Sequence, residues 1–158
     1  MRSVVIIAFA IATGAMSANA QPAAPPKPVI QLRSLESYTV GGKEWVRHRY
    51  AVTNHSAYAA EMFAAAPDLP PCGANSKASR SWVDIYDGNG KRLYGFCALG
   101  SPDDLDKIWF ATPLGQVPPA AVYIEINDRK TGTKYRSNLA GTSFGPCVSG
   151  QPGAIQPG

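Results

Sequence analysis

The chain has few charged side chains and few of the residue types that usually carry out catalysis. Only 16% of its 158 residues are charged, and it holds two histidines and three cysteines. The charged fraction is well below the value of about 25% that is typical of globular domains. The formal net charge is +4, but the basic residues are dispersed along the chain. Dispersed basic residues are not the pattern of a nucleic-acid-binding protein, so we expect no nucleic-acid partner.

Long hydrophobic runs are also lacking, except at the N-terminus. Residues 4–12 form an uninterrupted apolar run, which is about half the length that a membrane-spanning helix needs. A short basic start precedes this run, and the small-residue pattern Ala18-Asn19-Ala20 follows it. This order is typical of a secretory signal peptide, and the alternative is an uncleaved N-terminal anchor. We expect cleavage near Ala20, a secreted or periplasmic product and no membrane span in the mature chain.

The few cysteines would then lie in an oxidising compartment, where disulfides persist. We expect a disulfide between Cys72 and Cys97, because both fall inside the patterned part of the chain. Cys147 lies in a Gly/Pro-rich tail, where it is either a free thiol or half of an intermolecular bridge. No C-x-x-C pair is present and neither histidine has the spacing of a zinc ligand, so we expect no metal site and no cofactor.

Glycine and proline are frequent, with 15 and 14 copies, and they gather in the turns and towards the C-terminus. The chain divides into a signal peptide at 1–20, a Pro-rich leader at 21–28, a domain at 29–140 and a flexible Gly/Pro-rich tail at 141–158. Within the domain, apolar and polar residues mostly alternate, which predicts half-buried strands. The expected strands cover residues 29–40, 44–53, 81–87, 91–99, 108–112, 121–128 and 133–138.

Short strands separated by turn residues predict an all-β fold. We expect a single antiparallel β-sandwich of about seven strands, with an immunoglobulin-like or fibronectin-like architecture. Gly41-Gly42 and the segment 87–90 (DGNG) favour hairpin turns between neighbouring strands.

Two places interrupt the strand pattern. Residues 102–107 predict one short helical turn, because they begin with proline and Ser101 can cap them. Residues 57–66 are ambiguous, since their alanines favour a helix whereas a sandwich needs another strand there. We favour the extended form, with a strand at 58–63.

The first candidate site is a patch of aromatic and arginine side chains. Alternation along the second expected strand turns Trp45, Arg47 and Arg49 outward, and Tyr123 points outward from a later strand. If these strands are neighbours, Trp45 and Tyr123 are exposed and close together. Such a patch suits partner recognition by stacking and bidentate pairing, and the simpler alternative is a solvated face. His48 falls on the inward face, where we expect a position near a strand end with a hydrogen-bond partner.

The second candidate is the uncharged, proline-rich loop at residues 112–119 (TPLGQVPP). Its candidate contact residues are Pro113, Leu114 and Val117. A stiff loop loses little conformational entropy on binding, so it suits an inhibitor that presents the loop to an enzyme cleft. The simpler alternative is a connection between two strands.

No catalytic site is expected. Residues 141–145 (GTSFG) match the G-x-S-x-G motif of serine hydrolases, but Pro146 follows at once and no histidine comes later. His55 and Ser143 could belong to a triad only if the fold brought them together, and nothing in the sequence fixes that geometry. The acidic residues at 84–90 lack the spacing of a calcium loop and are explained by hairpin turn chemistry.

These observations predict an exported, non-enzymatic binding module whose partner is an unknown protein or glycan. The first alternative is an inhibitor of a secreted hydrolase that acts through residues 112–119. The second alternative is a small secreted hydrolase.

Overall fold

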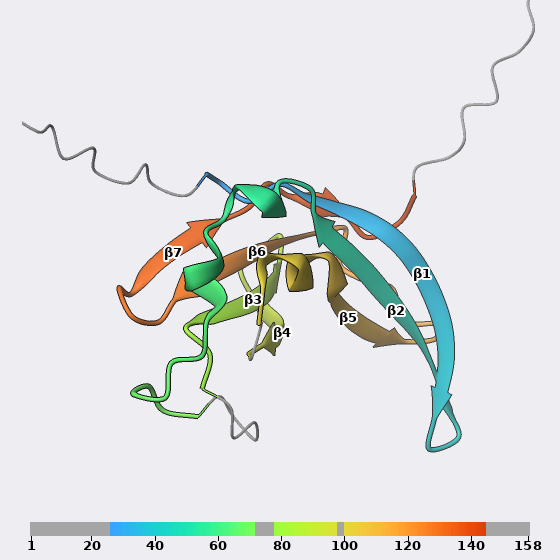
Figure 1. Cartoon of the computed structure of the whole chain (residues 1–158). Helices are drawn as coiled ribbons and strands as arrows, with labels where there is room; N and C mark the ends of the chain where they lie inside the picture. The colour runs from blue at the N-terminus through green and yellow to red at the C-terminus, as the bar shows by residue number, and fades with distance from the viewer. Residues whose placement is uncertain (1–25, 72–77, 98–99, 145–158) are drawn as a thin grey trace, which may run out of the picture.

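Strands dominate the computed structural model, which describes residues 26–71, 78–97 and 100–144 (Figure 1). They are β1 (Ile30–Val40), β2 (Lys43–Val52), β3 (Ser81–Asp87), β4 (Arg92–Phe96), β5 (Ile108–Pro113), β6 (Ala121–Asp128), β7 (Thr133–Arg136) and β8 (Ala140–Gly141). One antiparallel sheet has the order β1-β2-β5, and the other has the order β4-β3-β6-β7, with β8 paired to β6. The expected all-β, antiparallel two-sheet architecture is confirmed, and its immunoglobulin-like or fibronectin-like topology stays a prediction.

The longest strands, β1 and β2, form one curved hairpin around a two-glycine turn (Figure 1). Gly41 and Gly42 have φ angles of 58° and 74°. A two-residue hairpin turn of the favoured twist requires positive φ at both central positions, and glycine adopts it without strain. The turn sets the register, so that Tyr38 lies opposite Trp45.

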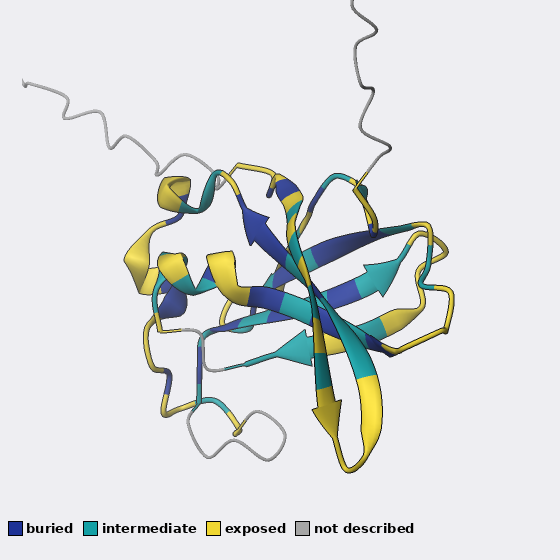
Figure 2. Cartoon of the chain, turned by 90° about the vertical axis from the view of Figure 1, so that its right-hand side faces the viewer, coloured by how far each residue is buried: buried dark blue, intermediate teal, exposed yellow. Residues whose placement is uncertain are grey.

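The apolar alternation of the strands builds one core shared by the two sheets (Figure 2). Val122, Ile124 and Ile126 of β6 are each at most 1% exposed, and Tyr50 and Val52 of β2 are equally buried. Burying a large apolar side chain contributes about 1.5–3 kcal/mol. Because these residues occupy the inward positions, their neighbours in sequence are directed to the outer faces of the sheets.

The connection from β2 to β3 differs from the prediction. The strand expected at 58–63 is wrong, because this segment contains the short 3-10 helix η2 (Ala60–Phe63), and another, η1 (His55–Ala57), comes just before it. Tyr58, Met62 and Phe63 of the connection are buried in the core. A strand would point the adjacent residues Met62 and Phe63 to opposite faces, whereas both are buried here. The connection therefore covers the core instead of adding a strand.

The helical turn predicted at 102–107 is confirmed as η3 (Pro102–Lys107). The Ser101 hydroxyl accepts a hydrogen bond from the backbone N–H of Asp103 at 3.1 Å. The Asp104 carboxylate in turn accepts one from the backbone N–H of Ser101. These bonds satisfy N–H groups that have no partner inside a helix, so they fix the start of η3.

Several predictions concern residues outside those described. They are the signal peptide at 1–20 and the two cysteines Cys72 and Cys147. The predicted Cys72–Cys97 disulfide therefore stays a prediction, and Cys97 itself is half-buried at the end of β4. At the start of the predicted flexible tail, β8 pairs with β6, and Thr142 is buried just after it. None of the helices that the structure describes is long and apolar enough to cross a membrane.

Candidate functional site

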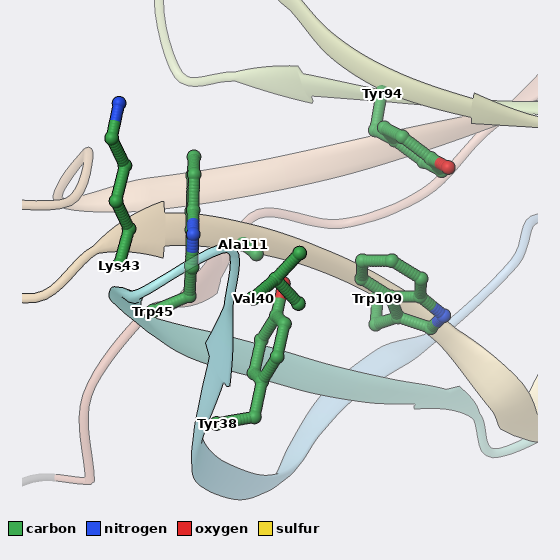
Figure 3. A pocket seen from close by; sticks show the side chains of 7 residues that line it. All are labelled: Tyr38, Val40, Lys43, Trp45, Tyr94, Trp109 and Ala111. Carbon is green, nitrogen blue, oxygen red and sulfur yellow. The ribbon is translucent and has the colours of Figure 1, made fainter.

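A pocket of about 420 Å³ lies where the β1–β2 hairpin, β5 and β4 come together (Figure 3). We call it the aromatic pocket. Its lining residues are Tyr38 and Val40 of β1, Lys43 and Trp45 of β2, Tyr94 of β4, and Trp109 and Ala111 of β5. The size is within the range of small-molecule sites, about 300–1,000 Å³. The pocket therefore offers room for a ring-sized ligand among aromatic faces.

Strand register explains how one side of the pocket forms. Trp45 lies opposite Tyr38 on β1 and opposite Pro113 on β5. Arg49 lies opposite Trp109. Because residues two apart on a strand share a face, these side chains gather on one face of the three-stranded sheet. Neighbouring strands thus bring together aromatic residues that are far apart in the sequence.

The other side of the pocket comes from the edge strand of the second sheet. The rings of Tyr94 and Trp109 are stacked, with their centroids 5.3 Å apart and an angle of 26° between the ring planes. Phe96 meets the edge of Trp109 at 5.9 Å. In Figure 3, Tyr94 and Trp109 lie on one side of the pocket and Trp45 on the other. The stacked pair fixes one wall, because each ring limits the rotation of the other.

Arg47 packs against two of the pocket's rings. Its guanidinium carbon lies 4.8 Å from the ring centroid of Tyr38 and 4.7 Å from that of Trp109. Both distances are within the range of cation–π contacts. Glu36 is 3.6 Å from the nearest Arg47 nitrogen, which is longer than a hydrogen bond. The aromatic contacts therefore position a guanidinium that pairs with Glu36 through Nη1 and whose buried Nε has no hydrogen-bond partner among the described residues.

The carboxylate beside Arg47 is bonded to other residues. Glu36 accepts hydrogen bonds from the Ser34 hydroxyl at 2.8 Å and from Arg49 at 3.2 Å, both at the same oxygen. The Ser34 hydroxyl is the main cause that lowers the pKa of Glu36, and Arg49 and Arg47 add to the effect. Glu36 thus stays ionised near neutral pH and partly balances the two arginines.

Polar atoms on the pocket rings also lack protein partners. Within the described residues, no hydrogen bond uses the hydroxyls of Tyr38 and Tyr94 or the ring N–H groups of Trp45 and Trp109. Aromatic residues elsewhere differ, since the ring N–H of Trp82 donates to Asp84 at 2.6 Å. None of these four rings is buried, and Tyr94 is 42% exposed, so a ligand in the pocket can take the place of water at their polar atoms.

The structure brings together three of the four predicted partner-binding residues. Trp45, Arg47 and Arg49 share one face of β2. Tyr123 lies on β6 in the other sheet and is only 5% exposed, because Arg136 covers its ring at 3.8 Å. The expectation that Trp45 and Tyr123 form one exposed patch is therefore wrong, since their strands are not neighbours. A partner-binding role for these residues stays a prediction.

Three aromatic residues of the pocket were missing from the sequence prediction. Tyr38 had a usable signal, because the Gly41-Gly42 turn places it directly opposite Trp45. Tyr94 and Trp109 had no such signal in the sequence, because the contact between their rings depends on how two strands from different sheets approach each other. Such long-range contacts do not follow from the alternation within a strand.

The candidate loop lies next to the hairpin. Pro113 ends β5, and the backbone N–H of Leu114 donates to the carbonyl of Glu44 at 2.9 Å. The N–H of Gln116 donates to the Pro113 carbonyl, which closes a tight turn. Leu114 is 53% exposed and Val117 is 87% exposed. The loop thus presents two apolar side chains to solvent from a turn that hydrogen bonds hold in place.

The remaining candidates, His55 and Ser143, make no hydrogen bond to each other within the described residues. His55 lies 3.4 Å from Asp103 and from Asp106, both on η3. Ser143 follows β8 and is exposed. No group of three or more potential metal ligands occurs within residues 26–71, 78–97 and 100–144.

His48 is buried as predicted, but it lies in the middle of β2 and not near a strand end. One ring nitrogen, Nδ1, is 3.1 Å from the Thr142 carbonyl, and Nε2 is 3.2 Å from the Thr112 hydroxyl. Its ring stacks on Phe110 with centroids 4.7 Å apart. The middle position is possible because both polar atoms of the ring find partners inside the fold.

Comparison with known proteins adds no relative, since no family model, no curated protein and no solved structure matches the chain.

Proposed function

We propose that the chain is an exported, non-enzymatic binding module that holds a protein or glycan partner in the aromatic pocket. The observation that carries this proposal is the meeting of four aromatic residues from four strands around one pocket. Exposed aromatic side chains cost free energy in water and contribute strongly to binding when a partner covers them. Uncommitted hydroxyl and N–H groups on the same rings supply the orientation that specific binding needs.

The test compares aromatic substitutions in the pocket with a matched one outside it. Binding of the full chain to glycan and peptide libraries identifies a ligand, and its affinity is then measured for Tyr94→Ala, Trp45→Ala and Tyr86→Ala. Tyr86 is the control, because it stacks on Tyr123 in the other sheet and does not line the pocket. We expect a loss of about tenfold or more for the two pocket variants and little change for the control. Equal effects of all three variants would contradict the proposal.

Export is a separate part of the proposal, and it rests on the signal-peptide pattern at the N-terminus. N-terminal sequencing of the protein recovered from its host checks it. We expect a mature chain that begins near residue 21, in the periplasm or the medium. An unprocessed chain in the cytosol would contradict export without affecting the pocket.

The loop after β5 supports a second candidate function, an inhibitor of a secreted hydrolase. The supporting observation is the strong exposure of Val117 on a loop whose turn is fixed by hydrogen bonds. A panel of secreted hydrolases is assayed with the native protein and with Val117→Asp. Inhibition that the substitution abolishes would support this function, and no inhibition at micromolar protein would exclude it.

A further inference from the structure

We infer that the ligand of the aromatic pocket is an acidic oligosaccharide, whose carboxylate pairs with Arg47 while a sugar ring packs against the aromatic faces. The inference rests on the proposed binding function and names its ligand class. It is carried by three features of the described residues: the state of Arg47, the balance of charge around the pocket and the polar atoms on the rings.

Arg47 is prepared for an anion. Two aromatic rings that line the pocket hold its guanidinium at 4.7 and 4.8 Å, and its contact with Glu36, from Nη1 at 3.6 Å, is longer than a hydrogen bond. Glu36, its ionic neighbour, gives its short contacts to Ser34 and Arg49. A planar guanidinium that is already ordered loses little entropy when it binds a carboxylate through two parallel hydrogen bonds. The ordered guanidinium, which Glu36 approaches only to 3.6 Å, therefore favours a ligand whose carboxylate comes closer to its terminal nitrogens.

The charge around the pocket points to the same kind of ligand. Lys43 lies at the pocket, Arg47 and Arg49 follow it on the same face of β2, and Glu36 pairs with both arginines. Lys43 forms no ion pair within the described residues and lines the pocket directly. Three cations and one carboxylate leave this face positive, which attracts an acidic ligand and repels a basic one.

The pocket walls suit a sugar ring. A pyranose has apolar C–H faces and polar hydroxyl edges, so it needs flat apolar surfaces together with hydrogen-bond groups. Trp45 and the stacked pair of Tyr94 and Trp109 supply such surfaces on the two sides of the pocket (Figure 3). The unbonded hydroxyl and N–H groups on these rings can serve the hydroxyl edge. A uronic acid also fixes its carboxylate to the ring, which matches a guanidinium fixed beside the rings.

The experiment measures binding of the full chain by calorimetry to matched pairs of ligands. Each pair is a uronic-acid tetrasaccharide (galacturonate, glucuronate or mannuronate) and the same sugar with its carboxylates reduced to hydroxymethyl groups. Acidic and proline-rich peptides are measured in the same way, as a comparison with the acidic and the reduced sugars. We expect at least one acidic sugar to bind about tenfold or more tightly than its reduced form, with an affinity that falls as salt rises.

Arginine variants assign the preference to the pocket. Arg47→Met should remove most of the preference for the acidic sugar, and Arg47→Lys should restore only part of it because the planar fork is lost. Arg92→Met is the matched control, since Arg92 also lies over a tryptophan and pairs with a carboxylate, but in the other sheet. Thermal unfolding of each variant checks that the fold is retained. If Arg47→Met does not fold, the comparison of each acidic sugar with its reduced form in the native chain decides alone.

The outcomes separate the inference from the proposed function. Equal affinity for acidic and reduced sugars, or binding of peptides alone, would overturn the inference and leave the binding function in place. The same holds for a preference that Arg47→Met leaves unchanged. Absence of any sugar or peptide binding at the pocket would overturn both.

Discussion

Arg80 and Asp128 form the ion pair that the fold buries most deeply among the described residues. Two parallel contacts join them, Nε to Oδ1 at 2.9 Å and Nη2 to Oδ2 at 2.7 Å. The Asp128 side chain is only 3% exposed, and the hydrogen bonds from Arg80 are the main cause that lowers its pKa to about 2. The pair ties the start of β3 to the end of β6, so a carboxylate lies buried at this junction of the second sheet.

Replacing Arg80 tests how much this junction contributes. We expect Arg80→Met to lower the free energy of unfolding by about 2–4 kcal/mol, because Asp128 would stay buried without its partner. Urea unfolding at neutral pH measures the change. The control is Arg92→Met, which removes an arginine that is half exposed and should cost less than about 1 kcal/mol. Equal losses for the two variants would contradict the special role of the buried pair.

His48 makes the stability of the protein depend on pH. Burial lowers its pKa below 6.5, although the hydrogen bond to the Thr142 carbonyl opposes the shift. The unfolded chain takes up a proton near pH 6.5, whereas the folded chain takes it up only at lower pH. The contribution of His48 is therefore complete above pH 6.5 and is lost as the pH falls from there through the folded pKa.

The pH dependence of a variant checks this sign. We expect the difference in unfolding free energy between the native protein and His48→Gln to shrink as the pH falls below 6.5. Chemical unfolding from pH 8 to pH 5 measures it, with His55→Gln as the control for the other histidine. A difference that stays constant over this range would contradict the prediction.

Side-chain direction was the part of the site that the sequence could reveal. Alternation along β2 correctly placed Trp45, Arg47 and Arg49 on one face, because a strand repeats every two residues. The same rule turned Tyr123 away from the core, but Arg136 and Tyr86 cover it there. Alternation along a strand predicts the direction of a side chain, but it does not predict which other side chains cover it.

Among the elements, the β1–β2 hairpin depends most on its turn. No atom lies within 4 Å of where a Cβ of Gly42 would stand, so its positive φ alone restricts the residue type. We expect Gly42→Val to lower the free energy of unfolding by about 1–2 kcal/mol, and Gly42→Asn to cost much less because asparagine tolerates this conformation. Urea unfolding of both variants measures this, and equal losses would contradict a conformational cause.

Elements with strong local signals were predicted well. The bounds expected for β3, β6 and η3 agree with the structure, because alternation or a cap with proline marks each of them. The strand predicted at 58–63 is wrong because the prediction assumed that a sandwich requires a strand there. Its buried residues instead pack on the core, Met62 and Phe63 from η2 and Tyr58 from between the two short helices. A segment can join a sheet only where an edge strand has room for another strand. That room depends on the whole assembled fold and cannot be predicted from a local pattern.

The whole molecule should unfold as one unit, because both sheets contribute to a single core. Trp82 reports on the five-stranded sheet, and Trp45 and Trp109 report on the three-stranded one. We expect Trp82→Phe and the double variant Trp45→Phe/Trp109→Phe each to show one urea transition by fluorescence that coincides with its own far-ultraviolet circular dichroism. Two transitions in either variant would show that the sheets unfold separately.

The β1–β2 hairpin extends beyond its third strand, since the ladder with β5 ends where Trp45 meets Pro113. Towards Gly41 the ribbon is two-stranded, and such ribbons bend more easily than sheets of three strands. The tip that carries Val40 and Lys43 is thus compliant, while Trp45 lies in the three-stranded part and the opposite wall of Tyr94 and Trp109 is held by its stacked rings. A pocket with one flexible wall can hold ligands of different thickness. We therefore expect the affinity to depend more on the charge of a ligand than on the size of its substituents.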